Sequence, residues 1–431
     1  MLTTLLARAT FAVSAWLARA EESSAAASLA RRRSERREAA EELRDANARL
    51  VARAAVVQHL ETNARYFSLL EPGELDPAAE LWLLARNSAP DDVHACNGTC
   101  HSPMWARSTV DALASDARAL GGGGGGGEAP INLTSDNDLA HNLAFARLAD
   151  GRVVAAGGQD NDPVARRGIH VFAARSRAEV LARGWLARAR ALSVVPGDHP
   201  GCVEARLDQA AKRRALPARA AEPPYRCRFD GKLSLVAFRG RLFLYARANV
   251  APVGGGRLVQ VTSAPGPEGP WDRFTLVTIA GFPAEPLERR PRAHDSAGLD
   301  ARNVYFAAVS ANPADNRTVL GLFPVLLNTA AAVSLALSCD GVAFSRLTRL
   351  VRSRESVISG HTTDQPVDGI VRRGDDVYFY VHRGVRGIRS WEPAGRPRLT
   401  RLTVPFATLA RYTADARASL ARAGLCEGPA T

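Results

Sequence analysis

Short hydrophobic runs separated by Gly, Pro, Asp and Asn dominate the chain from residue 131 onward, and this pattern predicts β-strands rather than helices. The clearest unit has runs at 232–238 and 241–246, with Arg239-Gly240 as the turn between them, and continues with runs at 257–261 and 274–277. Three further units show the same pattern. One, before this unit, has runs at 141–147, 152–156, 168–172 and near Leu186. The two after it have runs at 303–306, 319–323, 333–337 and 347–351, and at 369–371, 377–382 and 399–404.

Units of about four short strands that recur at intervals of about 80 residues are typical of β-propeller blades. The alternative is a β-sandwich, in which the strands follow one another at tighter and more even spacing. We therefore predict an all-β fold, a five-bladed β-propeller with an N-terminal helical arm. Four units are visible, so the fifth blade is inferred; residues 60–112 would close it by pairing with the chain end at 406–420. Residues 415–422 have a helical pattern, which counts against that closure.

The first twenty residues have the pattern of a secretory signal. A short apolar stretch at 9–18 lies between Arg8 and Arg19, and Ala18-Arg19-Ala20 fits the small-x-small rule before cleavage. The stretch is too short to span a bilayer. An organellar transit peptide and a retained signal-anchor are the alternatives. We expect no stable membrane span.

Between the signal and the strands lies a region at 21–120 that we predict to be helical and to contribute to blade closure. Within it, residues 24–56 alternate Arg and Glu densely, which suits a solvated helix with many ion pairs, or an oligomerising stalk. Seven glycines at 121–127 cannot hold a fixed backbone, so 121–130 is predicted to be a linker rather than a phosphate-binding loop. The propeller domain then spans 131–425.

Six cysteines and three Asn-x-Ser/Thr sequons favour an oxidising compartment, so we expect a secreted protein or one of the secretory-pathway lumen. The sequons begin at Asn97, Asn132 and Asn316. Cys96 and Cys100 lie beside two histidines, yet no second close pair of cysteines follows, as a zinc site would require. Disulfides are therefore expected, with the pairing left open.

The net charge of +12 suggests a polyanionic partner at first. However, only Lys212 and Lys232 are lysines, and the abundant arginines are scattered alongside many Ala and Gly residues. This composition indicates a coding bias rather than a nucleic-acid interface. We expect no nucleic-acid partner; a surface that tolerates sulfated or carboxylated glycans fits the charge better.

Several segments resemble the five-bladed propellers of the arabinanase, levansucrase and invertase clan. The resemblance lies in Phe-Asp-Gly-Lys-Leu-Ser at 229–234 with the following run 239–249, and in Ser-Cys-Asp-Gly-Val-Ala-Phe-Ser at 338–345. Segments 364–369 and 380–382 fit the same picture, so the resemblance covers most of residues 131–412. It implies a carbohydrate-active protein, a glycoside hydrolase or glycosyl-transferring enzyme whose partner is an oligo- or polysaccharide.

The clan further implies carboxylates at the starts of the inner strands, one acting as base or nucleophile and one as proton donor, because one carboxyl must be ionised while the other is protonated. The catalytic candidates precede the first strands of the four units: Asp138, Asp230, Asp300 (or Asp295) and Asp364. The candidates for substrate binding lie near the same strand ends: His141, Asn142, Arg247, Asn249, Asp368 and His382. A turn-forming Asp, or a buried side chain satisfied by the backbone, is the alternative at each position.

The sequence departs from the clan at the proton donor, which is typically a Glu at the start of the third blade. Here Glu285 and Glu288 lie upstream in a Pro-rich loop. A propeller that binds glycans without cleaving them is thus one alternative, and a protein-interaction scaffold that uses the charged arm at 24–56 is another. No Gly-x-Ser-x-Gly elbow occurs, and we expect neither a cofactor nor a metal.

Overall fold

The computed structural model describes only part of the chain, and all of that part belongs to one compact unit, residues 50–431. The described ranges are 53–59, 65–70, 81–88, 101–108, 142–158, 168–180, 185–203, 226–229, 231–249, 257–282, 302–327, 330–353, 364–385 and 398–427. The predicted signal at 1–20, the predicted linker at 121–130 and the cysteines at 96 and 100 lie outside them. No helix in these ranges is both long and apolar enough to cross a bilayer.

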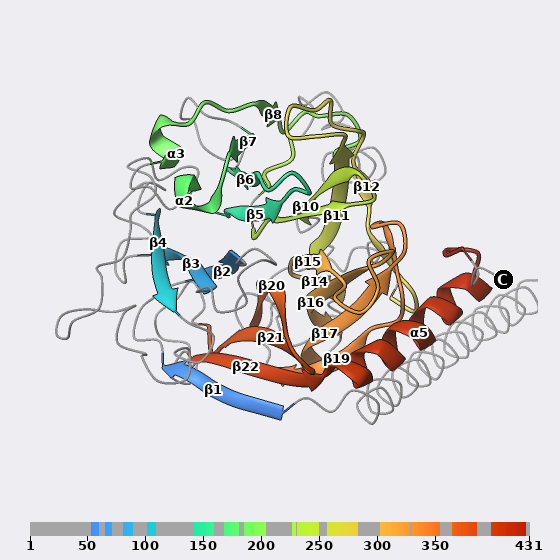
Figure 1. Ribbon diagram of the computed structural model, residues 1–431. Coiled ribbons are helices and arrows are strands. Elements are labelled where there is room, and N and C mark those ends of the chain that lie inside the picture. Colours follow the sequence, from blue (N-terminus) through green and yellow to red (C-terminus); the bar gives the residue numbers. More distant parts are fainter. Residues whose placement is uncertain are drawn as a thin grey trace, which may run out of the picture. The chain divides into compact units, whose positions relative to one another are not determined.

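Nearly all of the described elements are strands, which pair in antiparallel groups (Figure 1). The first three groups contain, from the innermost strand outward: β2 (Arg65–Leu70), β3 (Leu81–Ser88) and β4 (His101–Ser108); β5 (Ala144–Arg147), β6 (Val153–Gly157), β7 (Ile169–Ala174) and β8 (Ser193–Val195); β9 (Ser234–Phe238), β10 (Arg241–Asn249), β11 (Arg257–Ala264) and β12 (Thr275–Leu276).

Two further groups complete the arrangement. The fourth contains β14 (Arg302–Val304) and β15 (Ala308–Ala311), which both pair with β16 (Val319–Leu327), then β17 (Ala330–Ser338) and β19 (Thr348–Ser353), with β13 (Thr278–Ile279) and β18 (Ala343–Phe344) at its side. The fifth contains β20 (Gln365–Arg373), β21 (Asp376–Arg383), β22 (Arg398–Pro405) and β1 (Arg53–His59). The helices within the described ranges are α2 (Arg177–Val180), α3 (Trp185–Arg188) and α5 (Phe406–Arg422).

The innermost strands follow one another in a closed order. β2 lies beside β5, β5 beside β9, β9 beside β15, β15 beside β20, and β20 returns to β2 through a parallel pairing of Ser68 with Asp368. Successive sheets around a common centre are the architecture of a β-propeller. The β-propeller class predicted from the sequence is thus confirmed, whereas the number of blades stays our interpretation of this strand order.

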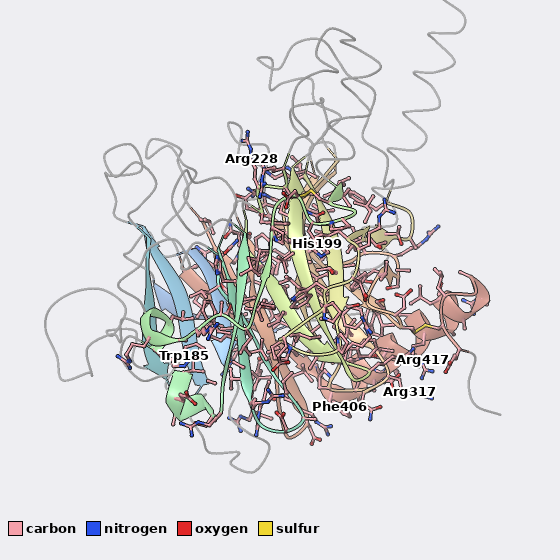
Figure 2. All side chains as sticks on the ribbon, turned by 90° about the horizontal axis from the view of Figure 1, so that it is seen from above. Trp185, His199, Arg228, Arg317, Phe406 and Arg417 are labelled. Atoms are coloured by element: carbon pink, nitrogen blue, oxygen red, sulfur yellow. A yellow bond between two sulfur atoms is a disulfide. The ribbon has the colours of Figure 1, made fainter. Side chains whose placement is uncertain are left out.

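Two-residue turns and alternating side chains explain why these segments form hairpins. Arg239 and Gly240 join β9 to β10 with φ of 50° and 71°, the positive values that a tight hairpin turn requires. Along β10, Leu242 and Leu244 face the sheet of β5–β8, whereas Phe243 and Tyr245 face the sheet of β14–β19. Both faces are buried because each sheet lies between two neighbours, and side chains fill the space between them (Figure 2).

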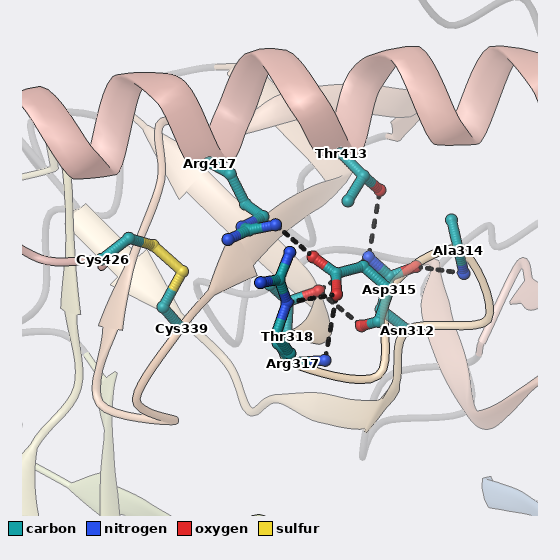
Figure 3. A network of polar contacts seen from close by, with 9 residues as sticks. All are labelled: Asn312, Ala314, Asp315, Arg317, Thr318, Cys339, Thr413, Arg417 and Cys426. Carbon is teal, nitrogen blue, oxygen red and sulfur yellow. Dashed lines mark hydrogen bonds and ion pairs between the residues drawn. A yellow bond between two sulfur atoms is a disulfide. The ribbon is translucent and has the colours of Figure 1, made fainter. Parts of the chain in front are cut away.

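The C-terminal helix α5 lies against the fourth and fifth groups. Leu409 and Leu420 are buried in the core cluster that those groups share. Asn312 Nδ2 donates a hydrogen bond to Thr413 Oγ1 (3.0 Å), and Arg417 Nη1 lies 3.0 Å from Asp315 Oδ2 (Figure 3). The disulfide Cys339–Cys426 joins the residue after β17 to the segment that follows the helix. Apolar, polar and covalent contacts therefore all hold α5 in place.

The two disulfides described, Cys202–Cys227 and Cys339–Cys426, confirm the prediction of disulfides for these four cysteines. Asn316, the acceptor of the third sequon, is exposed in the turn between β15 and β16. Asn97 and Asn132 lie outside the described residues.

Several predicted elements differ from the structure. Residues 53–59, 65–70, 81–88 and 101–108 are strands, so the helical interpretation of 21–120 is wrong for them; the Ala- and Arg-rich composition hid short β-branched runs such as Val56-Val57. The run near Leu186 is the short helix α3, with strand β8 after it. The predicted pairing with 406–420 is wrong because that segment is α5; the N-terminal strand β1 pairs with β22 instead.

Breaking the disulfide at α5 should destabilise the protein. We expect Cys339→Ala with Cys426→Ala to lower the free energy of unfolding by about 2–5 kcal/mol, because the bond closes a loop of 87 residues and so restricts the unfolded chain. Chemical denaturation without reductant measures the loss. Leu425→Ala, at an exposed neighbour of the bond, is the control and should change little. A loss below about 1 kcal/mol would mean that packing alone holds the helix.

Candidate functional site

Residues that precede the inner strands gather at one edge of the propeller. In the third group, Ser234 at the start of β9 pairs with Tyr245 near the end of β10, and Asn249 at that end pairs with Arg257 at the start of β11. The start of the first strand, the end of the second and the start of the third therefore share an edge. We call the edge at which the inner strands begin the mouth edge.

The predicted catalytic residues precede the inner strands, whose starts form this edge, and most of them lie outside the described residues. Asp138, Asp230, Asp300 and Asp295, together with His141, lie outside the described residues, and so does the side chain of Asn249. Their convergence stays a prediction. The remaining candidates are described, and all have buried side chains: Asn142, Arg247, Asp364, Asp368 and His382.

Asp364 stands immediately before β20 and fastens that strand to its neighbour. Its Oδ1 accepts a hydrogen bond from Gly384 N (2.9 Å), and its Oδ2 accepts one from Arg383 Nε (3.2 Å). Arg383 also donates to Arg352 O (3.1 Å), at the end of β19. Both carboxylate oxygens therefore hold strand ends together at the mouth edge.

Asn142 has a similar role before β5. Its Nδ2 donates to Phe229 O (3.0 Å), and its Oδ1 accepts from Gly158 N (2.9 Å). The side chain thereby connects the second group of strands to the segment that precedes β9. Because both the nitrogen and the oxygen of its side-chain amide are hydrogen-bonded, Asn142 has a structural role at the mouth edge.

Two arginines lie against Tyr305, between the third and fourth groups. The guanidinium carbons of Arg247 and Arg257 lie 4.9 and 5.2 Å from the centre of the tyrosine ring, within the range of cation–π attraction. A Cβ at Gly231 (φ +148°) would come within 3.0–3.1 Å of the Arg247 side chain. The glycine before β9 thus lets the backbone approach Arg247 closely.

A buried polar cluster lies where the five inner strands approach one another, and we call it the axial cluster. It consists of Lys232, Ser234, Asp368, Ser68 and the carbonyl of Leu143. Lys232 Nζ donates to Leu143 O (2.7 Å) and Leu233 O (2.8 Å), and lies 3.7 Å from Asp368 Oδ2. Ser234 Oγ donates to Asp368 Oδ1 (2.9 Å), and Ser68 Oγ lies 3.4 Å from Leu143 O.

The same serine extends the axial cluster to the fourth group, because Val309 N donates to Ser234 Oγ (2.8 Å). Each of the five inner strands, or the segment just before it, therefore contributes at least one member: Ser68, Leu143, Lys232 with Ser234, Val309 and Asp368. Lys232 and Asp368 are both almost completely buried.

Burial controls the protonation of this pair. Desolvation raises the pKa of Asp368 from 3.8 to about 6, although the neighbouring Lys232 opposes the rise. Desolvation likewise lowers the pKa of Lys232 from 10.5 to about 8, against the attraction of Asp368. Both pKa values shift toward the neutral forms, so the cost of removing water exceeds the attraction between the charges.

The sequence reasoning placed Asp368 among sugar-binding groups and missed Lys232, Ser234 and Tyr305. In the structure, Asp368 contacts Lys232 and Ser234 in the interior. Lys232 did carry a signal, because it is one of two lysines among 56 basic residues. In a chain that uses arginine nearly everywhere, a lysine within a hydrophobic run indicates a site where an arginine does not fit.

Among the described residues, no three His, Cys, Asp or Glu side chains lie close enough together to hold a metal ion. No model of a known protein family matches the chain. No curated protein matches it either.

Solved structures that are similar to this chain are named as glycoside hydrolases. One is Zg3597, a family 117 glycoside hydrolase from the marine bacterium Zobellia galactanivorans, with 11% identity over 83% of this chain and 92% of that chain and a TM-score of 0.44. Another is the catalytic domain of a family 62 α-L-arabinofuranosidase from Coprinopsis cinerea, with 8% identity over 82% of this chain and 97% of that chain and a TM-score of 0.46. A third is an α-L-arabinanase from Penicillium chrysogenum complexed with arabinobiose, with 10% identity over 83% of this chain and 97% of that chain and a TM-score of 0.40.

Removing the lysine of the axial cluster should destabilise the protein in a pH-dependent way. We expect Lys232→Met to lower the free energy of unfolding by about 3–5 kcal/mol at pH 8, since it leaves the Asp368 carboxylate buried without its counter-charge. The loss should shrink toward pH 5. A carboxyl whose pKa is raised in the folded state stabilises the fold most at low pH, and this contribution falls as the pH rises from 3.8 through 6. Without Lys232 that pKa rises further, and the decline extends to higher pH.

Chemical denaturation at pH 5 and pH 8 measures this difference. Arg152→Met is the control, because Arg152 forms an exposed ion pair with Asp150 (2.7 Å) that contributes little to stability. An equal loss for Lys232→Met at both pH values would contradict the assignment of the cost to the Asp368 carboxylate.

Proposed function

We propose that this protein is a carbohydrate-active propeller, a glycoside hydrolase or glycosyl-transferring enzyme that uses carboxylates at the mouth edge. The observation that carries the proposal is the common edge at which the inner strands begin. Asp364 directly precedes β20, and Asp300 lies just before β14. Asp138 and Asp230 lie a few residues before β5 and β9. A fold that brings these strand ends together supports a shared site for their acids.

The chemistry fits such a set of acids. Cleavage of a glycosidic bond needs one carboxyl to protonate the leaving oxygen and another to act as base or nucleophile, about 5–10 Å away. Asp138 and Asp230 are our candidates for these two roles, because the segments that follow them, at 142–143 and 231–233, are hydrogen-bonded to each other. Asp364, whose oxygens hold Gly384 and Arg383, would act as a positioning residue.

A second candidate function is glycan binding without catalysis. The observation that favours it is the state of the two candidate carboxylates that the structure describes. Both oxygens of Asp364 accept hydrogen bonds from the protein, and Asp368 is hydrogen-bonded to Ser234 and ion-paired with Lys232. The sequence also lacks a Glu at the start of β14, since Glu285 and Glu288 lie further upstream. In both functions the partner is an oligo- or polysaccharide, and the two disulfides fit a protein of the cell exterior or the secretory pathway.

Turnover assays separate the two functions. The purified protein would be assayed on a panel of aryl glycosides and native polysaccharides, and its binding to a glycan array would be measured in parallel. We expect Asp138→Asn and Asp230→Asn each to reduce kcat by at least about 100-fold, because each removes a group that transfers a proton or attacks the substrate. Binding on the array should persist in both variants.

Asp415→Asn provides the matched control, since Asp415 is exposed on α5, which begins beside the opposite edge of the sheets. Binding without any turnover would support the non-catalytic function. A protein that neither turns over a glycoside nor binds a glycan would overturn both.

A further inference from the structure

The segments before β5 and β9 are tied together at the mouth edge. Leu233 N donates to Asn142 O (3.2 Å), and Asn142 Nδ2 donates to Phe229 O (3.0 Å). Lys232 Nζ adds the bond to Leu143 O (2.7 Å). These bonds cross between two groups of strands that a covalent hairpin does not join, so the side chains of Asn142 and Lys232 fix how the two segments lie against each other.

The position of Lys232 depends in turn on the fifth group of strands. Asp368, on β20, lies 3.7 Å from the ammonium group, and Ser234 holds the other carboxylate oxygen. An ammonium group has three donors, and here two carbonyls and one carboxylate surround it. The larger planar guanidinium of an arginine could not make the same contacts inside a space that is completely buried.

We propose that Lys232 is a positioning residue of the mouth edge: it holds the segment before β5 against the segment before β9, and Asp368 holds its ammonium group in place. The consequence for catalysis rests on the proposed function, since the two segments follow Asp138 and include the neighbours of Asp230. The consequence for the backbone does not, and it can be measured without any substrate.

Stability alone does not account for a charged pair at this position. A buried ion pair replaced by neutral side chains of similar volume often leaves a protein as stable or more stable, whereas removal of one partner is costly. Lys232→Met with Asp368→Asn removes both charges and keeps the volumes close to the original ones. The double variant therefore separates the two roles, because it removes the bond to Leu143 O without leaving a lone buried charge.

Hydrogen exchange of individual backbone amides tests directly whether Lys232 holds the two segments together. In the double variant we expect the amides of Leu233 and Gly158, which both donate to Asn142, to exchange at least about tenfold faster than in the unsubstituted protein. The amide of Phe406, which donates to Asp375 O (2.7 Å) at the opposite edge, should keep its rate. The midpoint of chemical denaturation should recover most of the loss seen with Lys232→Met alone.

A kinetic measurement tests the consequence for catalysis. On a substrate found in the glycoside panel, kcat of the double variant should fall by about 100-fold, the effect expected when reacting groups move by about 1 Å, while KM changes less than about threefold. The matched control is Asp315→Asn with Arg417→Met, which removes a partly buried ion pair beneath α5 and should leave kcat and the exchange of Leu233 unchanged.

The outcomes separate cleanly. Unchanged exchange of Leu233 and Gly158 in a folded double variant would overturn the proposal. So would faster exchange with an unaltered kcat, because the tie would then not position catalytic groups. If the unsubstituted protein turns over no glycoside, the proposed catalysis fails, and the exchange measurement alone decides whether Lys232 ties the segments.

Discussion

A lysine buried against a carboxylate, at the point where five inner strands approach one another, is the interaction on which the arrangement of this propeller depends. Lys232 is almost completely buried. Burial lowers its pKa and raises that of Asp368, so it favours the neutral form of each group. Removing water from the pair thus costs more than the attraction between the charges returns. The pair is better understood through the groups it connects than through net stabilisation, because it links the segment before β9 to β20 and to the residue before β5.

Propeller geometry explains why polar groups occur there at all. Inner strands have a neighbour in their own sheet on one side only, so carbonyl and amide groups that face the centre lack ladder partners. Leu143 O and Val309 N are such groups, and side chains of the axial cluster satisfy them. A purely apolar centre would leave these backbone groups buried without hydrogen bonds, at a cost of about 1–3 kcal/mol for each group. The axial cluster therefore solves a problem that the fold itself creates.

The sequence predicted much of the strand arrangement, because alternation of side chains and the positions of turn residues are local signals. The hairpin around Arg239-Gly240 and the run that became β16 were found in this way. Pairing between distant segments has no local signal, so the partner of the N-terminal strands was misplaced at 406–420. Strand β15 was missed because the predicted run ended at Phe306, whereas the inner strand resumes at Ala308. The Arg-rich composition obscured β1–β4 for a different reason, since arginine and alanine favour helices on average.

For the site residues, the sequence predicted only at which edge of the sheets they lie. Acids that precede inner strands must lie at the end where those strands begin, and this reasoning placed Asp364 at the start of β20. It could not tell whether a carboxylate faces a ligand or a neighbouring strand, since that depends on partners far away in sequence, such as Gly384 for Asp364 and Lys232 for Asp368. The scarcity of lysine was the better guide to the interior. Where nearly all basic residues are arginines, a lysine indicates a site that needs a more compact hydrogen-bond donor. In a buried run, such a donor must be surrounded by oxygen atoms that accept its hydrogen bonds.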